Sequence, residues 1–231
     1  MSFLQNFLNN LDVSALRTLA ISAIASLVCI ILHECAHGFA ADCMGDHTAR
    51  RNGRLSWNPV RHIDAFGLLM MVTVGVGWAK PVPVDARNFK HPKRGMAITA
   101  LAGPVSNFLL AAAALFLAGV LYRLPLGSMS DALWTAYSFV WMLLVRVAVL
   151  SVGLGLFNLI PIPPLDGSKV LFSFLPERIY FFILRYERYV MLAVMLVMWS
   201  GVFDAPLNAA IRAVLRVLCT LTGFPQTVFG F

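Results

Sequence analysis

Three residues in the first part of the chain, His33, Glu34 and His37, form the motif HECAH. The two histidines are four residues apart, about 40° around a helix, so both imidazoles can reach one metal ion from the same face. Glu34 stands beside them, where its carboxylate can take a proton from an attacking water and pass it to a leaving amine. These residue types at this spacing predict metal-assisted peptide hydrolysis, the chemistry of zinc peptidases.

A catalytic zinc ion usually has three protein ligands and keeps a fourth position for water, so the motif needs one more ligand. Asp166 is a candidate because it follows the Pro-rich stretch of NLIPIPPLDG, where Gly167 permits a tight turn. On the pattern alone, a surface turn with an ordinary aspartate explains this segment equally well. The weaker candidates lie too close along the chain or in polar segments, and they are Asp42, Asp46, His47, His62 and His91.

The segments that must position these residues are strongly apolar. Hydrophobic residues make up 59% of the 231 residues and charged residues 13%, which is far from the composition of a soluble domain. A spanning helix needs about 20 apolar residues. Four segments meet this length, namely Leu16–Ala41, Met96–Leu121, Leu133–Ile160 and Ile179–Val202. A shorter fifth segment, Leu207–Leu221, carries two arginines and favours an interfacial helix, so we expect an all-α polytopic membrane protein with four to five transmembrane helices.

HECAH lies inside the first apolar segment, roughly 8 to 14 Å from the membrane edge that follows at Asp42. Three ionisable groups at that depth are costly and are rarely kept without a function, so the location favours metal binding over a structural histidine pair. The same segment has no Lys or Arg before Arg17 and no small-residue cleavage site, so we do not expect a removable signal peptide. A further intramembrane charge, Arg146, is expected to face protein or water and to pair with an acidic group.

Positive charge is distributed unequally between the two sides of the membrane. Nine of the 18 Lys and Arg residues fall between Gly45 and Arg94 and four more between Pro161 and Arg188, whereas the opposite loops hold only Arg123. By the positive-inside rule, the two basic segments are expected to be cytoplasmic. The net charge of +7 suits an anionic leaflet, and no basic-aromatic motif accompanies it, so no nucleic-acid partner is expected. The four cysteines show no CxxC pair and are expected to be reduced.

Between the first two apolar segments lies Phe66–Val84, which is rich in glycine, proline and β-branched residues. This composition favours extended strands, and both ends of the segment are expected on the same side of the membrane. We therefore predict a re-entrant β-like hairpin, whose edge near Val72–Val84 would hold an unwound substrate by β-addition. No repeat or long polar insertion interrupts the chain, so residues 1–231 are expected to form a single domain.

Five motifs, in this order and at this spacing, resemble those of the site-2 protease family of intramembrane zinc proteases. They are HECAHGFAA, GRLSWNPVRHID, GWAKPVPVD, ALAGPVSN and NLIPIPPLDG. The resemblance implies a Zn2+ ion held by His33, His37 and Asp166, with Glu34 as general base and acid. The chain has no room for the inserted PDZ or CBS domain of longer relatives, so the resemblance implies a minimal catalytic core without that form of regulation.

The same resemblance draws attention to two asparagines. Asn158, eight residues before Asp166, is expected to bind substrate or to steady the oxyanion, although a helix-to-helix hydrogen bond explains it equally well. Asn107 matches the family pattern too, and the same substrate or oxyanion role is considered for it. The small residues around Asn107 favour a role in helix packing instead. His62 and Asp64 are expected to form a local polar anchor.

These expectations combine into a zinc-dependent endopeptidase that hydrolyses membrane-spanning proteins in the bilayer, near the cytoplasmic face of a prokaryotic inner or plasma membrane. Two alternatives stay open: a transporter with an intramembrane His/Asp site, and a non-catalytic membrane scaffold. The lack of inverted repeats and the presence of Glu34 argue against the transporter, and the complete motif with its aspartate argues against the scaffold. The pattern names neither the substrate nor the oligomeric state.

Overall fold

The computed structural model describes residues 13–64, 80–124, 130–176, 193, 197 and 201–231. Every extended stretch of regular structure in these residues is helical, which confirms the expected all-α membrane fold. The α-helices are α2 (Val13–Cys43), α3 (Thr48–Arg51), α5 (Pro92–Tyr122), α6 (Asp131–Asn158), α7 (Asp166–Ser173) and α9 (Asp204–Thr222). Short 3-10 helices are η1 (Pro59–Arg61), η2 (Ala86–Asn88) and η3 (Gln226–Phe229).

Four of the described helices are long and apolar enough to cross a membrane, judged by length and composition. They are Ser14–Cys43, Pro92–Tyr122, Asp131–Asn158 and Asp204–Thr222. The first three agree closely with the predicted spans. The fourth, α9, is the segment for which an interfacial helix was favoured, and its 19 residues are long enough to cross as well. The predicted span Ile179–Val202 lies almost entirely outside the described residues.

The structure does not support the predicted hairpin. Residues 66–79 lie outside the described part of the chain, and the remaining stretch, Lys80 to Val84, forms no strand. Pro81 and Pro83 have no N–H group to donate to a neighbouring strand, which explains why this end of the segment does not build a ladder. Among the described residues, its one hydrogen bond to another backbone group runs from the Lys80 N–H to the His62 carbonyl at 2.8 Å.

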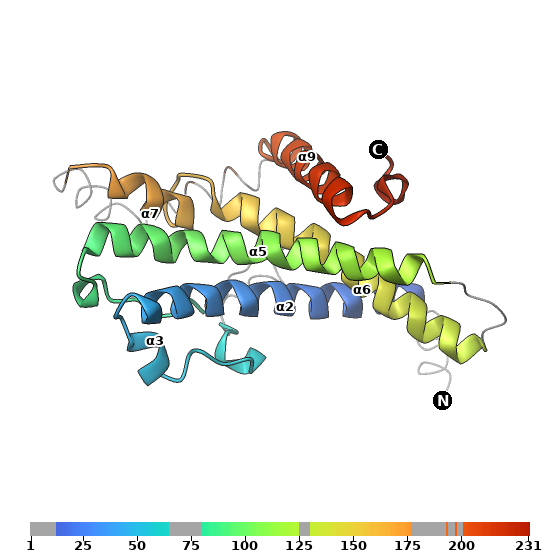
Figure 1. The fold of residues 1–231 in the computed structure, drawn as a ribbon, viewed down its shortest axis with the longest axis horizontal. Coiled ribbons are helices and arrows are strands. Elements are labelled where there is room, and N and C mark those ends of the chain that lie inside the picture. Colours follow the sequence, from blue (N-terminus) through green and yellow to red (C-terminus); the bar gives the residue numbers. More distant parts are fainter. Residues whose placement is uncertain (1–12, 65–79, 125–129, 177–192, 194–196, 198–200) are drawn as a thin grey trace, which may run out of the picture.

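Helices α2, α5 and α6 pack against one another along the long axis of the molecule (Figure 1). The chain runs along α2, returns along α5 and runs forward again along α6. Helix α7 packs against α5 near the end of α2, and α9 packs against α5 and α6. The end of α2, the beginning of α5 and α7 therefore meet at one end of the bundle.

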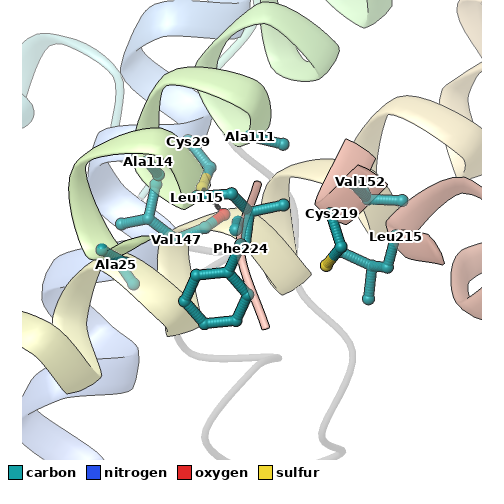
Figure 2. Close-up of a cluster of buried hydrophobic side chains, with 12 residues drawn as sticks. Ala25, Cys29, Ala111, Ala114, Leu115, Val147, Val152, Leu215, Cys219 and Phe224 are labelled. Carbon is teal, nitrogen blue, oxygen red and sulfur yellow. Dashed lines mark hydrogen bonds between the residues drawn. The ribbon is translucent and has the colours of Figure 1, made fainter. Parts of the chain in front are cut away.

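The middle of the bundle is held together by small and branched side chains. Figure 2 shows a buried cluster to which α2, α5, α6, α9 and the turn after α9 all contribute. Its members are Ala25, Cys29, Ala111, Ala114, Leu115, Ala118, Val147, Ala148, Val152, Leu215, Cys219 and Phe224. Lipid tails are as apolar as leucine, so helices in a membrane gain stability mainly from close contact, which small side chains permit. All four cysteines are free in the structure.

A polar cap closes the end of the bundle where α2 finishes. The Asp46 carboxylate is fully buried, and it accepts hydrogen bonds from the backbone N–H of Asp85 at 2.7 Å and from the Asn88 amide at 2.7 Å. Burial alone would raise the pKa of Asp46, but the bonds from Thr48, Asn88 and Asp85 hold it below its ordinary value near 3.8. Nearby, the Arg87 guanidinium lowers the pKa of the half-buried Asp85 carboxyl to about 2. Asp46 thus joins the end of α2 to η2.

Candidate metal centre

Three donor atoms of the predicted site form a small triangle at the end of the bundle. The Nε2 atoms of His33 and His37 are 3.0 Å apart, and the Asp166 Oδ2 atom is 3.1 Å from the first and 3.0 Å from the second. All three residues are buried. Their ligand atoms all lie within 4.8 Å of one another. Within the described residues, these three side chains form a group that could hold a metal ion. The structure therefore brings together the three residues for which ligation was predicted.

The triangle joins residues from two separate helices. Both histidines lie on α2, while Asp166 is the first residue of α7. Gly167 explains how α7 comes so close, because a Cβ atom at this position would collide with the backbone carbonyl of Leu159 just after α6. The Asp-Gly pair therefore places a carboxylate at a point where two backbone segments nearly touch.

Gly103 of α5 lies directly beside the two imidazoles. A Cβ atom added there would collide with His37 Nε2 and would lie 2.7 Å from His33 Cε1. Any side chain at this position would thus occupy the space next to the triangle. Gly103, one of the small residues of ALAGPVSN that predicted helix packing, thus also makes room for the candidate metal ligands.

Each imidazole has a second contact that determines which nitrogen can face a cation. His37 Nδ1 lies 2.7 Å from the Thr99 carbonyl, so it must donate its proton there, and Nε2 presents a lone pair to the triangle. His33 Nδ1 lies 3.0 Å from the Asn107 amide group, whose Oδ1 atom is buried and has no partner in the described part of the chain. A half-turn of this amide lets Oδ1 accept from His33 Nδ1, which frees the lone pair of His33 Nε2 as well.

These observations fit a zinc ion. Zinc bound by nitrogen and oxygen at about 2.0 to 2.1 Å in tetrahedral geometry has its ligand atoms about 3.3 Å apart. The edges of the triangle, 3.0 to 3.1 Å, come close to that value. Two imidazole lone pairs facing each other at this distance repel, and a cation between them removes the repulsion. Two histidines and one carboxylate are also a common donor set of catalytic zinc.

Lys169 holds the second oxygen of the candidate carboxylate ligand. Its Nζ atom lies 3.0 Å from Asp166 Oδ1, one turn further along α7, while Oδ2 faces the histidines. The carboxylate is therefore oriented with one oxygen toward the triangle. We did not predict this role, although the spacing of three residues on a helix was a readable signal.

Glu34 is half-buried, and its carboxylate is held by the backbone of a distant segment. Its Oε2 atom accepts a hydrogen bond from the Val82 N–H at 2.8 Å. A bond of this kind to an ionised carboxylate is short and strong, and it leaves the other oxygen available for proton transfer. Nothing in the residue types indicated Val82, because the group that makes the contact is a backbone amide.

The other predicted residues have different environments. Asn158 donates to the Leu154 carbonyl of its own helix at 3.0 Å. Arg146 is exposed, and its described contact is a 3.1 Å hydrogen bond to Ser22 Oγ on α2, where an acidic partner was expected. His62 is buried, and its Nε2 atom lies 2.7 Å from the Ser56 carbonyl. The weaker ligand candidate Asp42 pairs instead with His47 and Arg50.

A bundle of helices of spanning length that buries two histidines and one aspartate side by side defines a class of helical proteins with a candidate metal centre. The model of Peptidase family M50 matches residues 21–201, a range that contains every member of the triangle. The chain belongs to this family, which is that of the site-2 proteases.

Three relatives carry names that describe zinc metalloproteases. "Putative zinc metalloprotease YwhC" of Bacillus subtilis (strain 168) is 38% identical over 156 residues, which cover 66% of this chain and 68% of that protein. "Putative zinc metalloprotease Rip2" is 30% identical over 151 residues in Mycolicibacterium smegmatis and 33% over 149 residues in Mycobacterium tuberculosis H37Rv. The match covers 63% of this chain and 53% of each Rip2 protein. No solved structure matches the chain significantly.

Proposed function

We propose that this protein is a zinc-dependent intramembrane endopeptidase that hydrolyses peptide bonds of membrane-spanning proteins. The observation that carries the proposal is the buried triangle of His33, His37 and Asp166, adjacent to Glu34, within helices long enough to cross a membrane. The names of the relatives support both zinc and proteolysis. The matched range 21–201 supports treatment of the chain as one catalytic domain.

In this proposal, His33, His37 and Asp166 hold the zinc ion through Nε2, Nε2 and Oδ2. When bound, zinc polarises the scissile carbonyl and lowers the pKa of a coordinated water. Thr99 and Asn107 fix the orientation of the two imidazoles, and Lys169 fixes that of the carboxylate. Asn107 is then a residue that orients His33, which differs from the substrate or oxyanion role considered for it from the sequence.

Glu34 is the proposed general base and acid. It takes the proton of the attacking water through one carboxylate oxygen and later delivers it to the departing amine. The Val82 N–H holds the other oxygen, so the base keeps one orientation during both transfers. Asn158 remains a candidate to bind substrate or steady the oxyanion, because its amide lies at the end of α6 close to the turn that leads to Asp166.

The proposed cleavage site lies near the cytoplasmic face of the membrane. The described end of the first basic segment leads into α5, and Lys169 of the second lies on α7, at the same end of the bundle as the triangle. By the positive-inside rule we propose that this end faces the cytoplasm, and the bacterial relatives support a prokaryotic plasma membrane. A helical substrate must first unwind there, because its scissile carbonyls are bonded within the helix.

The decisive experiment compares wild type with Glu34→Gln and Asp166→Ala. We expect Glu34→Gln to retain zinc and to lose cleavage by about a hundredfold or more, the usual contribution of a general base. Asp166→Ala should lose zinc as well. Membrane peptides that accumulate in cells carrying Glu34→Gln would identify substrates.

Each alternative predicts a different result in the same experiment. A transporter would move zinc into liposomes equally well as wild type and as Glu34→Gln, and a scaffold would show no difference in membrane peptides between the two. Cleavage at the wild-type rate by Glu34→Gln would refute the proposed role of Glu34.

A further inference from the structure

Arg54 is a buried arginine outside the metal centre that none of the roles above explains. It lies in the loop after α3, and only 9% of its surface is exposed. A guanidinium group is costly to bury unless it is well paired. Its Nη2 atom donates to the Lys80 carbonyl at 2.7 Å and to the Pro81 carbonyl at 3.1 Å. Arg54 therefore directs its charge at two successive backbone carbonyls of a single segment.

The loop that carries Arg54 is itself fixed. Gly53 has a φ of +62°, a conformation that favours glycine, and the Arg54 N–H donates to the Ala49 carbonyl at 2.9 Å. Ala49 is completely buried at the centre of the short helix α3. The arginine thus projects from a rigid turn, which makes it a fixed support for the segment that it contacts.

The segment bound by Arg54 presents one particular donor to Glu34. Pro81 and Pro83 have no N–H, so Val82 provides the one backbone donor between them. That N–H donates to Glu34 Oε2 at 2.8 Å. The Val82 side chain is buried, and it occupies the space that a Cβ atom at Gly38 of α2, one turn beyond Glu34, would approach.

Together these contacts form a continuous chain of hydrogen bonds and covalent bonds from Arg54 to Glu34. The guanidinium fixes the carbonyl of Pro81, which belongs to the same peptide group as the Val82 N–H. A peptide group is planar, so a constraint on its carbonyl oxygen is also a constraint on its N–H. Displacement of a reacting group by about 1 Å can reduce a rate by about a hundredfold.

We propose that Arg54 is a positioning residue for Glu34, and that it acts through the Pro81–Val82 peptide group. The inference rests on the proposed role of Glu34 as the base. Beyond that role, Arg54, a residue of a loop, keeps the Glu34 carboxylate in the orientation that proton transfer requires. If Arg54 had a purely structural role, its substitution would lower zinc content and stability. A positioning role instead predicts a lower kcat, the rate at which bound substrate is cleaved.

The test uses the full-length protein and a membrane-spanning reporter with a cytoplasmic fluorescent tag, chosen because wild type cleaves it and Glu34→Gln does not. In Arg54→Gln we expect kcat to fall between about tenfold and about a hundredfold, with KM, bound zinc and thermal stability unchanged. Arg54→Lys, which keeps the charge but not the planar fork, should retain an intermediate rate. Arg51→Gln is the matched control, because Arg51 is an exposed neighbour whose side chain contacts only the His47 carbonyl among its described bonds.

Two further measurements separate positioning from structural support. Added guanidinium should restore part of the kcat of Arg54→Ala and none of that of Glu34→Gln. Amide hydrogen exchange at Val82 should become faster in Arg54→Gln, and likewise in Glu34→Ala, because each variant removes one end of the same chain of contacts.

The inference is wrong if Arg54→Gln cleaves the reporter at the wild-type kcat, or if its loss of activity follows a loss of zinc or of thermal stability. It is also wrong if Val82 exchanges at the wild-type rate in Arg54→Gln. A different outcome, in which wild type and Glu34→Gln process every membrane protein alike, would refute the proposed peptidase function instead. The exchange of the Val82 amide is measured without any substrate, so the two failures are distinguishable.

Discussion

The two halves of the helix bundle bury very different side chains. Around the cluster that includes Ala25, Ala111 and Leu115, helices approach through alanine, valine and leucine, and the contacts are steric. Around His33 and His37, helices α2 and α5 bury imidazoles, and each imidazole has a partner for both of its nitrogens. Packing in the first half depends on the size and shape of the side chains, whereas contacts in the second half depend on particular nitrogen and oxygen atoms. Substitutions of equal size should therefore have unequal effects in the two halves.

Glycine to alanine substitutions on α5 offer the largest contrast. Gly103→Ala places a Cβ atom against His37 Nε2 and His33 Cε1, so we expect bound zinc to be lost and cleavage to fall by about a hundredfold or more. Gly119→Ala, on the same helix, meets its nearest neighbour, Phe224 Cα, at an ordinary 3.6 Å. It should retain both properties. Metal analysis and reporter cleavage measure the two effects, and a Gly103→Ala protein with full zinc content would contradict the described geometry.

Leu115→Ala tests the other half of the comparison. Leu115 is completely buried, so its truncation leaves a cavity and should lower the free energy of unfolding by about 2 to 5 kcal/mol. Unfolding in mixed micelles would measure the change, with Leu109→Ala as the control because Leu109 is 66% exposed. Zinc per folded molecule should stay unchanged. Selective loss of zinc without loss of stability would show that the two halves are not separate.

Asn107→Ala should weaken the candidate centre, in addition to the small cavity that truncation of this buried side chain leaves. Removal of the amide leaves His33 Nδ1 without its partner, and loss of such a support usually weakens metal binding by about tenfold to a hundredfold. Competition against a zinc chelator gives the affinity. Ser106→Ala is the control, because the Ser106 hydroxyl bonds only its own helix at the Gly103 carbonyl among its described contacts. Equal zinc affinities in the two variants would exclude the proposed role of Asn107.

The smallest effect is expected in the polar cap. Because the folded-state pKa of Asp46 is below its ordinary value near 3.8, the stabilisation is fully present above that pH and is lost as pH falls through the lowered pKa. Asp46→Asn should cost about 1 kcal/mol of local stability at pH 7 and should make the cap less sensitive to acid. Hydrogen exchange of the Asp85 and Asn88 backbone amides, measured at pH 7 and as the pH is lowered, reports both the local stability and its sensitivity to acid. An identical acid response in wild type and variant would rule Asp46 out as the titrating group.

The sequence predicted the long helices well, because a membrane requires long apolar segments and leaves few alternatives. His33 and His37 were readable from their helical spacing alone. Asp166 was not, because it lies 133 residues away from His33 and a simple turn explained it equally well, so its assignment depended on the family resemblance.

Several contacts of the centre had no signature in the residue types. Thr99 contributes a carbonyl and Val82 an N–H, and every residue type has a carbonyl, so only the fold can reveal such partners. The sequence predicted that Gly103 lets helices approach, but it could not show that the α2 side chains brought close are the two imidazoles, because a glycine carries no mark of its neighbour.

The separation of His33 from Asp166 along the chain also bears on how the protein is made. Both histidines belong to the first long helix, which enters the membrane while the rest of the chain is still being synthesised. Until α7 docks against α5, that helix carries two donors of a three-donor centre. A partly synthesised chain therefore cannot complete the candidate metal centre, and the proposed hydrolytic activity would arise only when the C-terminal half has assembled onto the N-terminal half.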